Sequence, residues 1–281
     1  MRISGFTFCR NALRYDYPVV ESIQSILPIV DEFVVNVGRC DDGTLEHIRS
    51  IGDPKIRVVE SVWDETLRKD GLIYSQQTNI ALSQCTGDWA FYLQADEIIH
   101  EGDLPKILDA VRLNHRNPAV RGLLFRYLHF VGDYWSLNPW FYHKAVRIIR
   151  NNGEIESCGD AVGFHLKATG QYLQSGPSEW LAFSGARVFH YGWVKDPKVM
   201  LAKKQEQTKV YHGDTPPHSE ARLYNQDTFD FEDYSILKDF SGSHPAVMRA
   251  RLAAARRRGT RRNRWMNWRF YRELVRRGFR G

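Results

Sequence analysis

Long apolar runs are missing from this chain of 281 residues, since no stretch approaches the roughly 18 consecutive apolar residues of a membrane-spanning helix. Cysteine is scarce, and its four copies form no Cys-x-x-Cys pair: Cys9, Cys40, Cys85 and Cys158. This spacing argues against a structural zinc site and a disulfide framework. The first residues run into an apolar stretch without the pattern of a secretory signal. We therefore expect a cytoplasmic protein with reduced thiols.

The last 33 residues lack lysine and almost lack acidic residues. Residues 249–281 hold 13 arginines against one acidic residue, Glu273, so this segment carries a formal charge of +12. Subtracting it from the total of +6 leaves the first 248 residues near −6. At about 100° per residue the apolar side chains fall on one connected stripe; it comprises Trp265, Trp268, Tyr271, Leu274 and Val275.

A basic helix with an aromatic stripe is typical of in-plane binding to a membrane, with arginines facing anionic lipid. The residues expected to make this contact are Trp265, Trp268, Arg269, Tyr271 and Arg272. Two alternatives stay open. The tail can dock on the acidic body of the same protein or on a partner subunit. It can also bind nucleic acid through phosphate contacts and stacking, which we consider unlikely here.

Strand-like and helix-like segments alternate along the first hundred residues. The pattern predicts strands over residues 2–8, 32–37, 56–60 and 88–93, and helices over 17–27, 44–51 and 75–84. Such alternation is typical of an α/β fold with a parallel sheet covered by helices on both faces. The turn over residues 38–44 is polar and contains glycine, with Thr44 placed to cap the next helix.

The fourth predicted strand ends in two adjacent carboxylates, Asp96 and Glu97. Ligands of open α/β sheets bind outside the carboxyl ends of the strands. Carboxylates at that place commonly hold a divalent cation that shares its other positions with phosphate oxygens. The pair therefore suggests a nucleotide diphosphate nearby. The alternative is that both residues begin a helix, whose dipole favours acidic side chains.

Residues 6–11, 38–44 and 94–97 together resemble the GT-A glycosyltransferases of bacterial family 2. The resemblance implies a GT-A fold, a Rossmann-like mixed sheet flanked by helices. It implies a nucleotide-sugar pocket formed by Phe8, Arg10, Asn11, Asp41, Asp42, Gln94, Ala95 and Asp96. It also implies Mn²⁺ or Mg²⁺ on the donor diphosphate, held by Asp96, Glu97 and His190. The chain departs from the family's Asp-x-Asp element at Gln94, which replaces the first carboxylate.

The chemistry of sugar transfer needs these residue types. Cleavage of a sugar–diphosphate bond leaves negative charge on phosphate, which a bound cation stabilises. The attacking hydroxyl needs a carboxylate that accepts its proton. Asp160 matches the family's base, with Glu156 and Asp133 as fallbacks, and a single displacement of this kind inverts the anomeric carbon. The alternatives are a turn aspartate for Asp160 and a satisfied strand histidine for His190.

An aromatic-rich segment over residues 125–142 allows two interpretations. Aromatic residues at this density most often build a core. Trp135 and Trp140 lie in a predicted loop, where they can instead form a wall that stacks on an acceptor sugar. Further along, residues 197–212 are predicted to form a helix, and residues 213–233 an irregular lid or insertion.

These observations predict a nucleotide-sugar-binding half over residues 1–105, an acceptor-binding and catalytic half over 106–240, and a basic helical tail over 241–281. The predicted activity is inverting transfer of a sugar, preferably from a UDP-sugar, to a saccharide or lipid-linked acceptor in bacterial cell-surface polysaccharide or lipopolysaccharide synthesis. The predicted location is the inner face of the cytoplasmic membrane. The alternatives are a non-catalytic scaffold of a polysaccharide assembly complex and a nucleotidyltransferase, which lacks support because no glycine-rich triphosphate loop follows the first strand.

Overall fold

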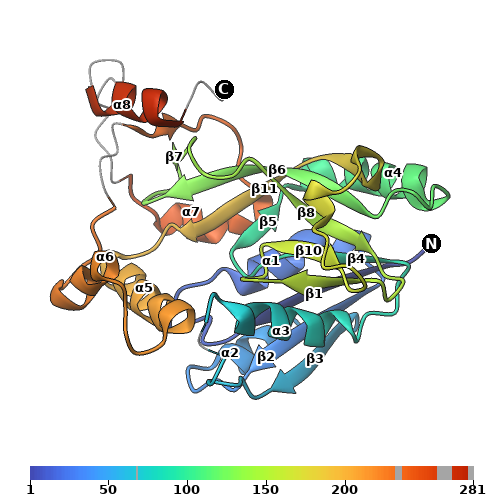
Figure 1. Ribbon diagram of the computed structural model, residues 1–281, viewed down its shortest axis with the longest axis horizontal. Helices are drawn as coiled ribbons and strands as arrows, with labels where there is room; N and C mark the ends of the chain where they lie inside the picture. Colours follow the sequence, from blue (N-terminus) through green and yellow to red (C-terminus); the bar gives the residue numbers. More distant parts are fainter. Residues whose placement is uncertain (68, 232–235, 258–267, 278–281) are drawn as a thin grey trace.

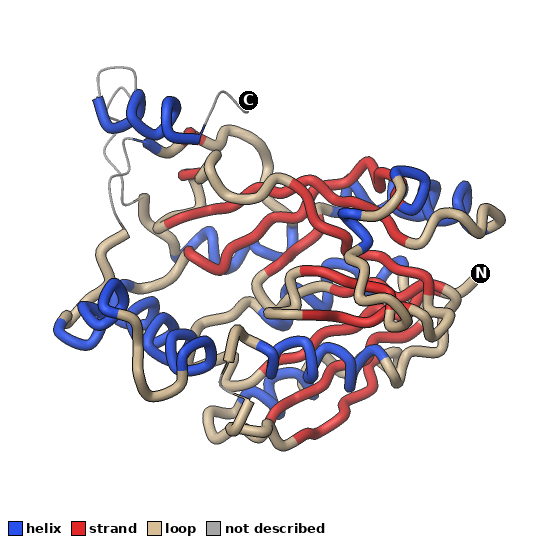
Figure 2. The backbone as a smooth tube through the Cα atoms, in the orientation of Figure 1, coloured by secondary structure: helices blue, strands red, loops and turns tan. Residues whose placement is uncertain are grey.

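The structure is a computed structural model that describes residues 1–67, 69–231, 236–257 and 268–277. Its core is one large mixed sheet (Figures 1 and 2), whose strands run in the order β12-β7-β6-β8-β4-β1-β2-β3. Both predicted halves contribute strands to this sheet, which joins them through the pairing of β4 with β8. Helices cover the sheet, and the fold is the predicted α/β arrangement of a mixed sheet flanked by helices.

The first half of the sheet is parallel, as predicted. Its strands are β1 (Ile3–Cys9), β2 (Glu32–Gly38), β3 (Ile56–Ser61) and β4 (Trp89–Tyr92). In β1 every residue but one is fully buried, and all of β4 is. This follows from their central positions, because parallel strands are covered on both faces and read as continuous apolar runs.

Helices of the first half lie on opposite faces of this sheet. α1 (Val19–Ile26), α2 (Thr44–Arg49) and α4 (Leu104–His115) contribute to one core cluster with the strands. α3 (Leu72–Leu82) packs on the other face together with the hairpin of β9 (Ile155–Cys158) and β10 (Gly163–Leu166). Figure 1 shows α3 in front of the strands and α1 behind them. The prediction that Thr44 caps α2 is wrong: Gly43 precedes the helix, and the Thr44 hydroxyl accepts a hydrogen bond from the backbone of Ala12.

The second half of the sheet is mixed. β8 (Lys144–Arg150) is antiparallel to both β4 and β6 (Gly122–Val131), whereas β11 (Leu181–Trp193) is parallel to β6 and antiparallel to β5 (Glu97–Ile99). Two short strands, β7 (Ser136–Leu137) and β12 (Lys238–Asp239), extend the edge. β5 begins directly after Asp96, so Asp96 lies at the junction of the two halves.

The remaining helices lie toward the C-terminus. α5 (Pro197–His212) has the predicted bounds, and Asp196 caps its first turn. The predicted irregular segment contains α6 (His218–Ala221) and a short 3₁₀ turn. α7 (Arg249–Ala254) and α8 (Trp268–Arg277) follow. Within the described ranges, no helix is long and apolar enough to cross a membrane.

Candidate functional site

A cavity of about 290 Å³ opens at the carboxyl ends of β1 and β4, against α5. The nucleotide-pocket predictions that line it are Phe8, Arg10, Asn11, Gln94, Ala95 and Asp96. Asp160 and His190, predicted from the later half of the chain, line it too. Eight predicted residues from four separate segments therefore meet at one cavity, although neighbouring segments are about 30 residues or more apart in the sequence.

An aromatic wall forms one side of this cavity. The Phe8 ring stacks on Tyr74 at 5.9 Å between centroids, and Trp63 lies at 5.9 Å from both rings. The Arg10 guanidinium lies 5.3 Å from the centre of the Trp63 ring. Burial raises the pKa of Tyr74 far above its usual value, so its hydroxyl stays protonated. A planar base can stack on such a wall, because every base presents a π-face.

Three polar atoms on the cavity lining are buried without a hydrogen-bond partner among the described residues: Asn11 Oδ1, Trp63 Nε1 and Arg10 Nε. Buried polar atoms are otherwise nearly always paired, because an unpaired one forfeits its hydration. One acceptor and two donors of cavity-lining residues are thus unpaired in this arrangement.

Asp41 and Asp42, predicted to hold the nucleotide, do not line this cavity. The Asp41 side chain is 74% exposed and forms an ion pair with Arg14 at 2.7 Å. Asp42 accepts hydrogen bonds from the backbone of Arg14 and from the backbone and hydroxyl of Thr44. Asp42 thus joins the turn after β1 to the start of α2, and its contact with a nucleotide stays a prediction.

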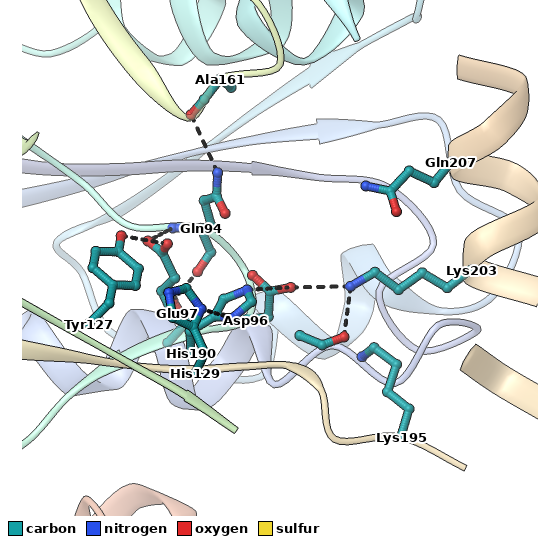
Figure 3. Close-up of polar contacts among 12 residues, drawn as sticks. Gln94, Asp96, Glu97, Tyr127, His129, Ala161, His190, Lys195, Lys203 and Gln207 are labelled. Carbon is teal, nitrogen blue, oxygen red and sulfur yellow. Dashed lines mark hydrogen bonds and ion pairs between the residues drawn. The ribbon is translucent and has the colours of Figure 1, made fainter. Parts of the chain in front are cut away.

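Asp96 is the carboxylate at the centre of the site. Its Oδ2 lies 3.4 Å from the ammonium of Lys203 on α5 and 3.8 Å from His190 Nε2 (Figure 3). Burial acts to raise the pKa of Asp96, but the neighbouring positive charges, of which Lys203 is the largest, together outweigh it and the net shift is downward. The carboxylate is therefore ionised at neutral pH.

Gly192 allows Asp96 and His190 to approach each other. A Cβ atom at this position would lie 2.5 Å from Asp96 Oδ2 and 2.7 Å from His190 Nε2. Both distances are shorter than real contacts, so any side chain at Gly192 would displace the two residues.

His190 is held by a second histidine, His129 on β6. Their Nδ1 atoms are 3.0 Å apart, and His129 Nε2 lies 2.7 Å from the carbonyl oxygen of Tyr142. Burial lowers the pKa of His129 to about 3 and also lowers the pKa of His190, so both rings are neutral. A carbonyl only accepts, so His129 donates from Nε2 and accepts at Nδ1. His190 then donates from Nδ1, which leaves the Nε2 lone pair facing Asp96.

Glu97 points away from the cavity, which is at odds with its predicted role as a metal ligand. Its carboxylate is fully buried and accepts two hydrogen bonds of 2.8 Å from the Arg147 guanidinium, one on each oxygen. Tyr127 donates a third, of 2.7 Å. These hydrogen bonds occupy both oxygens of Glu97, so Asp96 and Glu97 do not both face one cation in this arrangement.

The residues around Asp96 do not fit a divalent cation in this arrangement. Gln94 donates from its amide nitrogen to the carbonyl of Ala161 and can offer a neutral oxygen only, and both oxygens of Glu97 are bound by Arg147. Asp96 remains as the facing carboxylate, and Lys203 already neutralises it. Throughout the described part of the chain, no three His, Cys, Asp or Glu residues gather as a metal-binding group. Asp96 and the His190 lone pair would be the protein ligands if Lys203 moved away.

Asp160 lies in the turn between β9 and β10 and accepts a 2.7 Å hydrogen bond from the Tyr211 hydroxyl on α5. Gly159, with φ of +57°, gives the turn its left-handed backbone. Of the two fallback bases, neither lines the cavity: Glu156 pairs with His165 at 3.0 Å, and Asp133 is buried and accepts from the backbone of Trp135. Asp160 is thus the one of the three that borders the cavity.

A larger cavity of about 810 Å³ adjoins the first and shares Trp193, Lys204, Gln207 and Tyr211 with it. Trp140 lines this second cavity, as the predicted acceptor wall requires, whereas Trp135 packs against the core cluster around Phe130.

The tail has two kinds of surface. In α8, Trp268 and Tyr271 are exposed, and the Arg272 guanidinium lies 4.9 Å from the centre of the Trp268 ring. Phe270 is buried, 6.1 Å from the ring of Trp140, and Arg251 of α7 pairs with Asp16 and Glu21 at 2.6 Å. Trp265 and the Arg269 side chain lie outside the described residues.

Sequence reasoning missed the contributions of α5 and of the buried Arg147. Lys203, Gln207 and Tyr211 line the cavity from one face of α5, at a spacing of four residues. This polar stripe was visible in the sequence, since residues four apart share a helix face. No local signal identifies Arg147, which lies in a strand-like run fifty residues after Glu97.

No protein-family model matches the chain, and no curated sequence is similar to it. Similar solved structures include TarS of S. aureus, at 12% identity over 81% of this chain and 43% of that chain, with a TM-score of 0.44. The structure of TarS residues 1–349 with UDP-GlcNAc is 12% identical, covers 79% of this chain and 69% of that chain, and has a TM-score of 0.41. The structure of glucosyl-3-phosphoglycerate synthase of Mycobacterium tuberculosis with Mn²⁺, UDP-Glc and phosphoglyceric acid is 18% identical. It covers 46% of this chain and 43% of that chain, with a TM-score of 0.31.

The chain thus spans less than half the length of TarS and of the synthase. At these identities the likeness concerns the course of the chain and not activity.

Proposed function

We propose that the chain is a glycosyltransferase that moves a sugar from a nucleotide-diphosphate donor to a saccharide or lipid-linked acceptor with inversion. The observation that carries this proposal is the cavity at the ends of β1 and β4, where eight predicted residues meet. Its unpaired Asn11, Arg10 and Trp63 atoms are suited to a nucleotide, and Asp160 lies on the same lining.

In this proposal the base of the donor stacks on the wall of Phe8, Trp63 and Tyr74. Asn11 Oδ1 accepts a hydrogen bond from the nucleoside, which satisfies an otherwise unpaired buried oxygen. The diphosphate lies toward Asp96 and Lys203. UDP is the preferred nucleotide, and the base preference comes from the family resemblance.

The reaction is a single displacement. The acceptor oxygen forms a bond to the anomeric carbon while the bond from that carbon to the phosphate oxygen breaks. The electron pair of the broken bond stays on the diphosphate, and the acceptor proton passes to Asp160. Tyr211, whose pKa is raised by burial and by Asp160, stays protonated and holds the Asp160 carboxylate with its hydrogen bond.

The adjoining cavity of about 810 Å³ is the proposed acceptor site. Its walls include Trp140, Phe141 and Trp193, and aromatic rings stack on the apolar faces of sugars. The shared residues Gln207 and Tyr211 would lie where donor and acceptor meet.

Calorimetric titration of the protein with UDP, GDP, CMP and ADP tests the proposed donor site. We expect one nucleotide to bind selectively and Trp63→Ala to weaken it about 5- to 150-fold, because stacking of a base contributes about 1–3 kcal/mol. Trp180→Ala is the matched control, since Trp180 also stacks on an arginine, Arg121 at 4.9 Å, but lines neither cavity. Absence of binding for all four nucleotides would contradict the proposal and favour the scaffold function.

We also propose that the tail holds the protein at an anionic membrane surface. Trp268, Tyr271 and Val275 of α8 are 65%, 47% and 85% exposed, at a spacing that puts them on one face of the helix. Phe270 is buried against the body, so α8 offers its other face outward.

Replacement of Trp268, Tyr271 and Val275 together by serine should lower binding to phosphatidylglycerol vesicles at least about tenfold, since each apolar side chain loses its burial in the interface. Co-sedimentation measures the bound fraction. Phe183→Ser is the control, because Phe183 is 54% exposed at a site remote in sequence from the tail. Equal sedimentation of both variants would contradict membrane binding. The role of the tail would then be to dock on the body of the protein, where Arg251 already pairs with Asp16 and Glu21.

A further inference from the structure

Two lysines, Lys203 and Lys195, act on the charge of the Asp96 carboxylate, and a third, Lys204, lines the same cavity. Lys203 is 3.4 Å from the carboxylate, and the buried Lys195 lies close enough to act on its charge. Lys204 follows Lys203 on α5, and its ammonium lies 4.3 Å from the centre of the Trp193 ring and 3.0 Å from Gln207 Oε1. Figure 3 shows Lys203 extending from α5 toward Asp96, with Lys195 beside it. The ammonium of Lys203 therefore lies against Asp96, where the family resemblance places a cation on the donor diphosphate.

The other carboxylates of the cavity do not cancel this charge at Lys203. Glu206 and Asp160 also line the cavity, and their charges act on Tyr74. The carboxylate that acts on Lys203 is Asp96, both through its charge and by a hydrogen bond. A divalent cation beside Asp96 would be repelled by this ammonium, since like charges at short range disfavour each other.

From this geometry we propose that Lys203, assisted by Lys204, binds the diphosphate of the donor in place of a divalent cation, so that sugar transfer does not require metal. The proposal rests on the proposed function. An ammonium is a strong donor to phosphate oxygens. In the displacement, the electron pair left on the diphosphate oxygen is stabilised by hydrogen bonds from Lys203 and Lys204, while the acceptor proton goes to Asp160.

The position of Lys203 suits this role. Its ammonium is also fixed by the carbonyl of Gly192 at 2.9 Å and lies 4.7 Å from the centre of the Tyr17 ring. Groups held in place before the reaction stabilise developing charge without reorganisation. Burial lowers the pKa of Lys204 to about 8. Near that pH, the Lys204 amine is therefore uncharged in a fraction of the molecules until an anion binds. Binding of a diphosphate near pH 8 should therefore take up protons.

Titration of UDP into the full chain, once in EDTA and once in Mn²⁺, tests the proposal. We expect affinities that agree within about threefold in the two buffers for the wild type. Lys203→Met should weaken binding in EDTA about 10-fold or more, since a hydrogen bond to a charged group is lost. Lys203→Arg should keep most of the affinity. Lys209→Met is the control, because Lys209 is exposed on the same helix and lines neither cavity.

The outcomes separate the two proposals. Binding of UDP that needs Mn²⁺ and survives Lys203→Met would overturn the lysine role and leave the glycosyltransferase function, with Asp96 and His190 as the metal ligands. The paramagnetic resonance of bound Mn²⁺ would then change on Asp96→Ala. Failure of every nucleotide to bind in both buffers would overturn both proposals. Thermal unfolding of Lys203→Met and Lys203→Arg shows whether a loss of UDP affinity in either variant results from misfolding.

Discussion

Replacement of Asp160 by asparagine should lower the turnover of the donor sugar by about 10²- to 10⁴-fold, the usual contribution of a positioned general base. Asparagine keeps an oxygen that can accept the hydrogen bond from Tyr211, which holds Asp160 at 2.7 Å. It cannot take up the proton of an attacking hydroxyl. Release of UDP from UDP-sugars, with water as the acceptor, measures this effect without knowledge of the natural acceptor.

Nucleotide affinity separates loss of the base from loss of the site. UDP should bind Asp160→Asn within about threefold of the wild type, because the proposed contacts of the nucleotide come from β1, the aromatic wall and the two lysines of α5. Glu156→Gln is the matched control, since Glu156 lies on the same hairpin but pairs with His165 outside the cavity. If Glu156→Gln or Asp133→Asn abolishes turnover and Asp160→Asn does not, the base is misassigned.

The parts of the site that could be predicted are those encoded within a few residues. A buried parallel strand is a continuous apolar run, and the residues that follow it emerge at one edge of the sheet. Phe8, Arg10, Asn11 and Asp96, which end or follow such strands, line the cavity, while their roles in nucleotide binding stay predictions. The long helix α5 was equally readable, because Asp196 and Pro197 mark its start.

The rest depends on contacts between distant segments. Asp96 and Glu97 are neighbours in sequence, yet the first faces the cavity and the second faces the interior. Which of them faces the cavity is decided by Arg147, whose partner cannot be read from its surroundings in β8. Lys203 meets Asp96 across 107 residues. The sequence shows which residues are charged, but it does not show which of them form ion pairs in the folded protein.

Removal of the Arg147 side chain should have the largest effect on stability. Arg147 and Glu97 are both 0% exposed, and the guanidinium also donates to the carbonyls of Val146 and Val162. Its carbon lies 5.4 Å from the ring centre of Tyr92 and 5.3 Å from that of Tyr127. We expect Arg147→Ala to lower the free energy of unfolding by about 3–5 kcal/mol, because Glu97 is left as a buried charge without its partner.

Urea unfolding measures this loss, with Arg49→Ala as the control. Arg49 forms an ion pair of the same length, 2.8 Å, with Glu60, but both side chains are more than half exposed. Water screens such a pair, so its loss should change the free energy of unfolding by less than about 1 kcal/mol. A similar small change for both variants would show that Glu97 finds another partner when Arg147 is removed.

A double variant separates the charge from the packing. Glu97→Gln together with Arg147→Met removes both charges, keeps an acceptor for Tyr127 and roughly fills the space of the guanidinium. It should recover a large part of the stability lost in Arg147→Ala, since an uncharged pair of similar volume needs no burial of ions. Recovery would show that the loss in Arg147→Ala comes from the unpaired buried charge of Glu97 and not from lost packing. The same bond keeps the second carboxylate out of the cavity, and Lys203 then faces Asp96 alone.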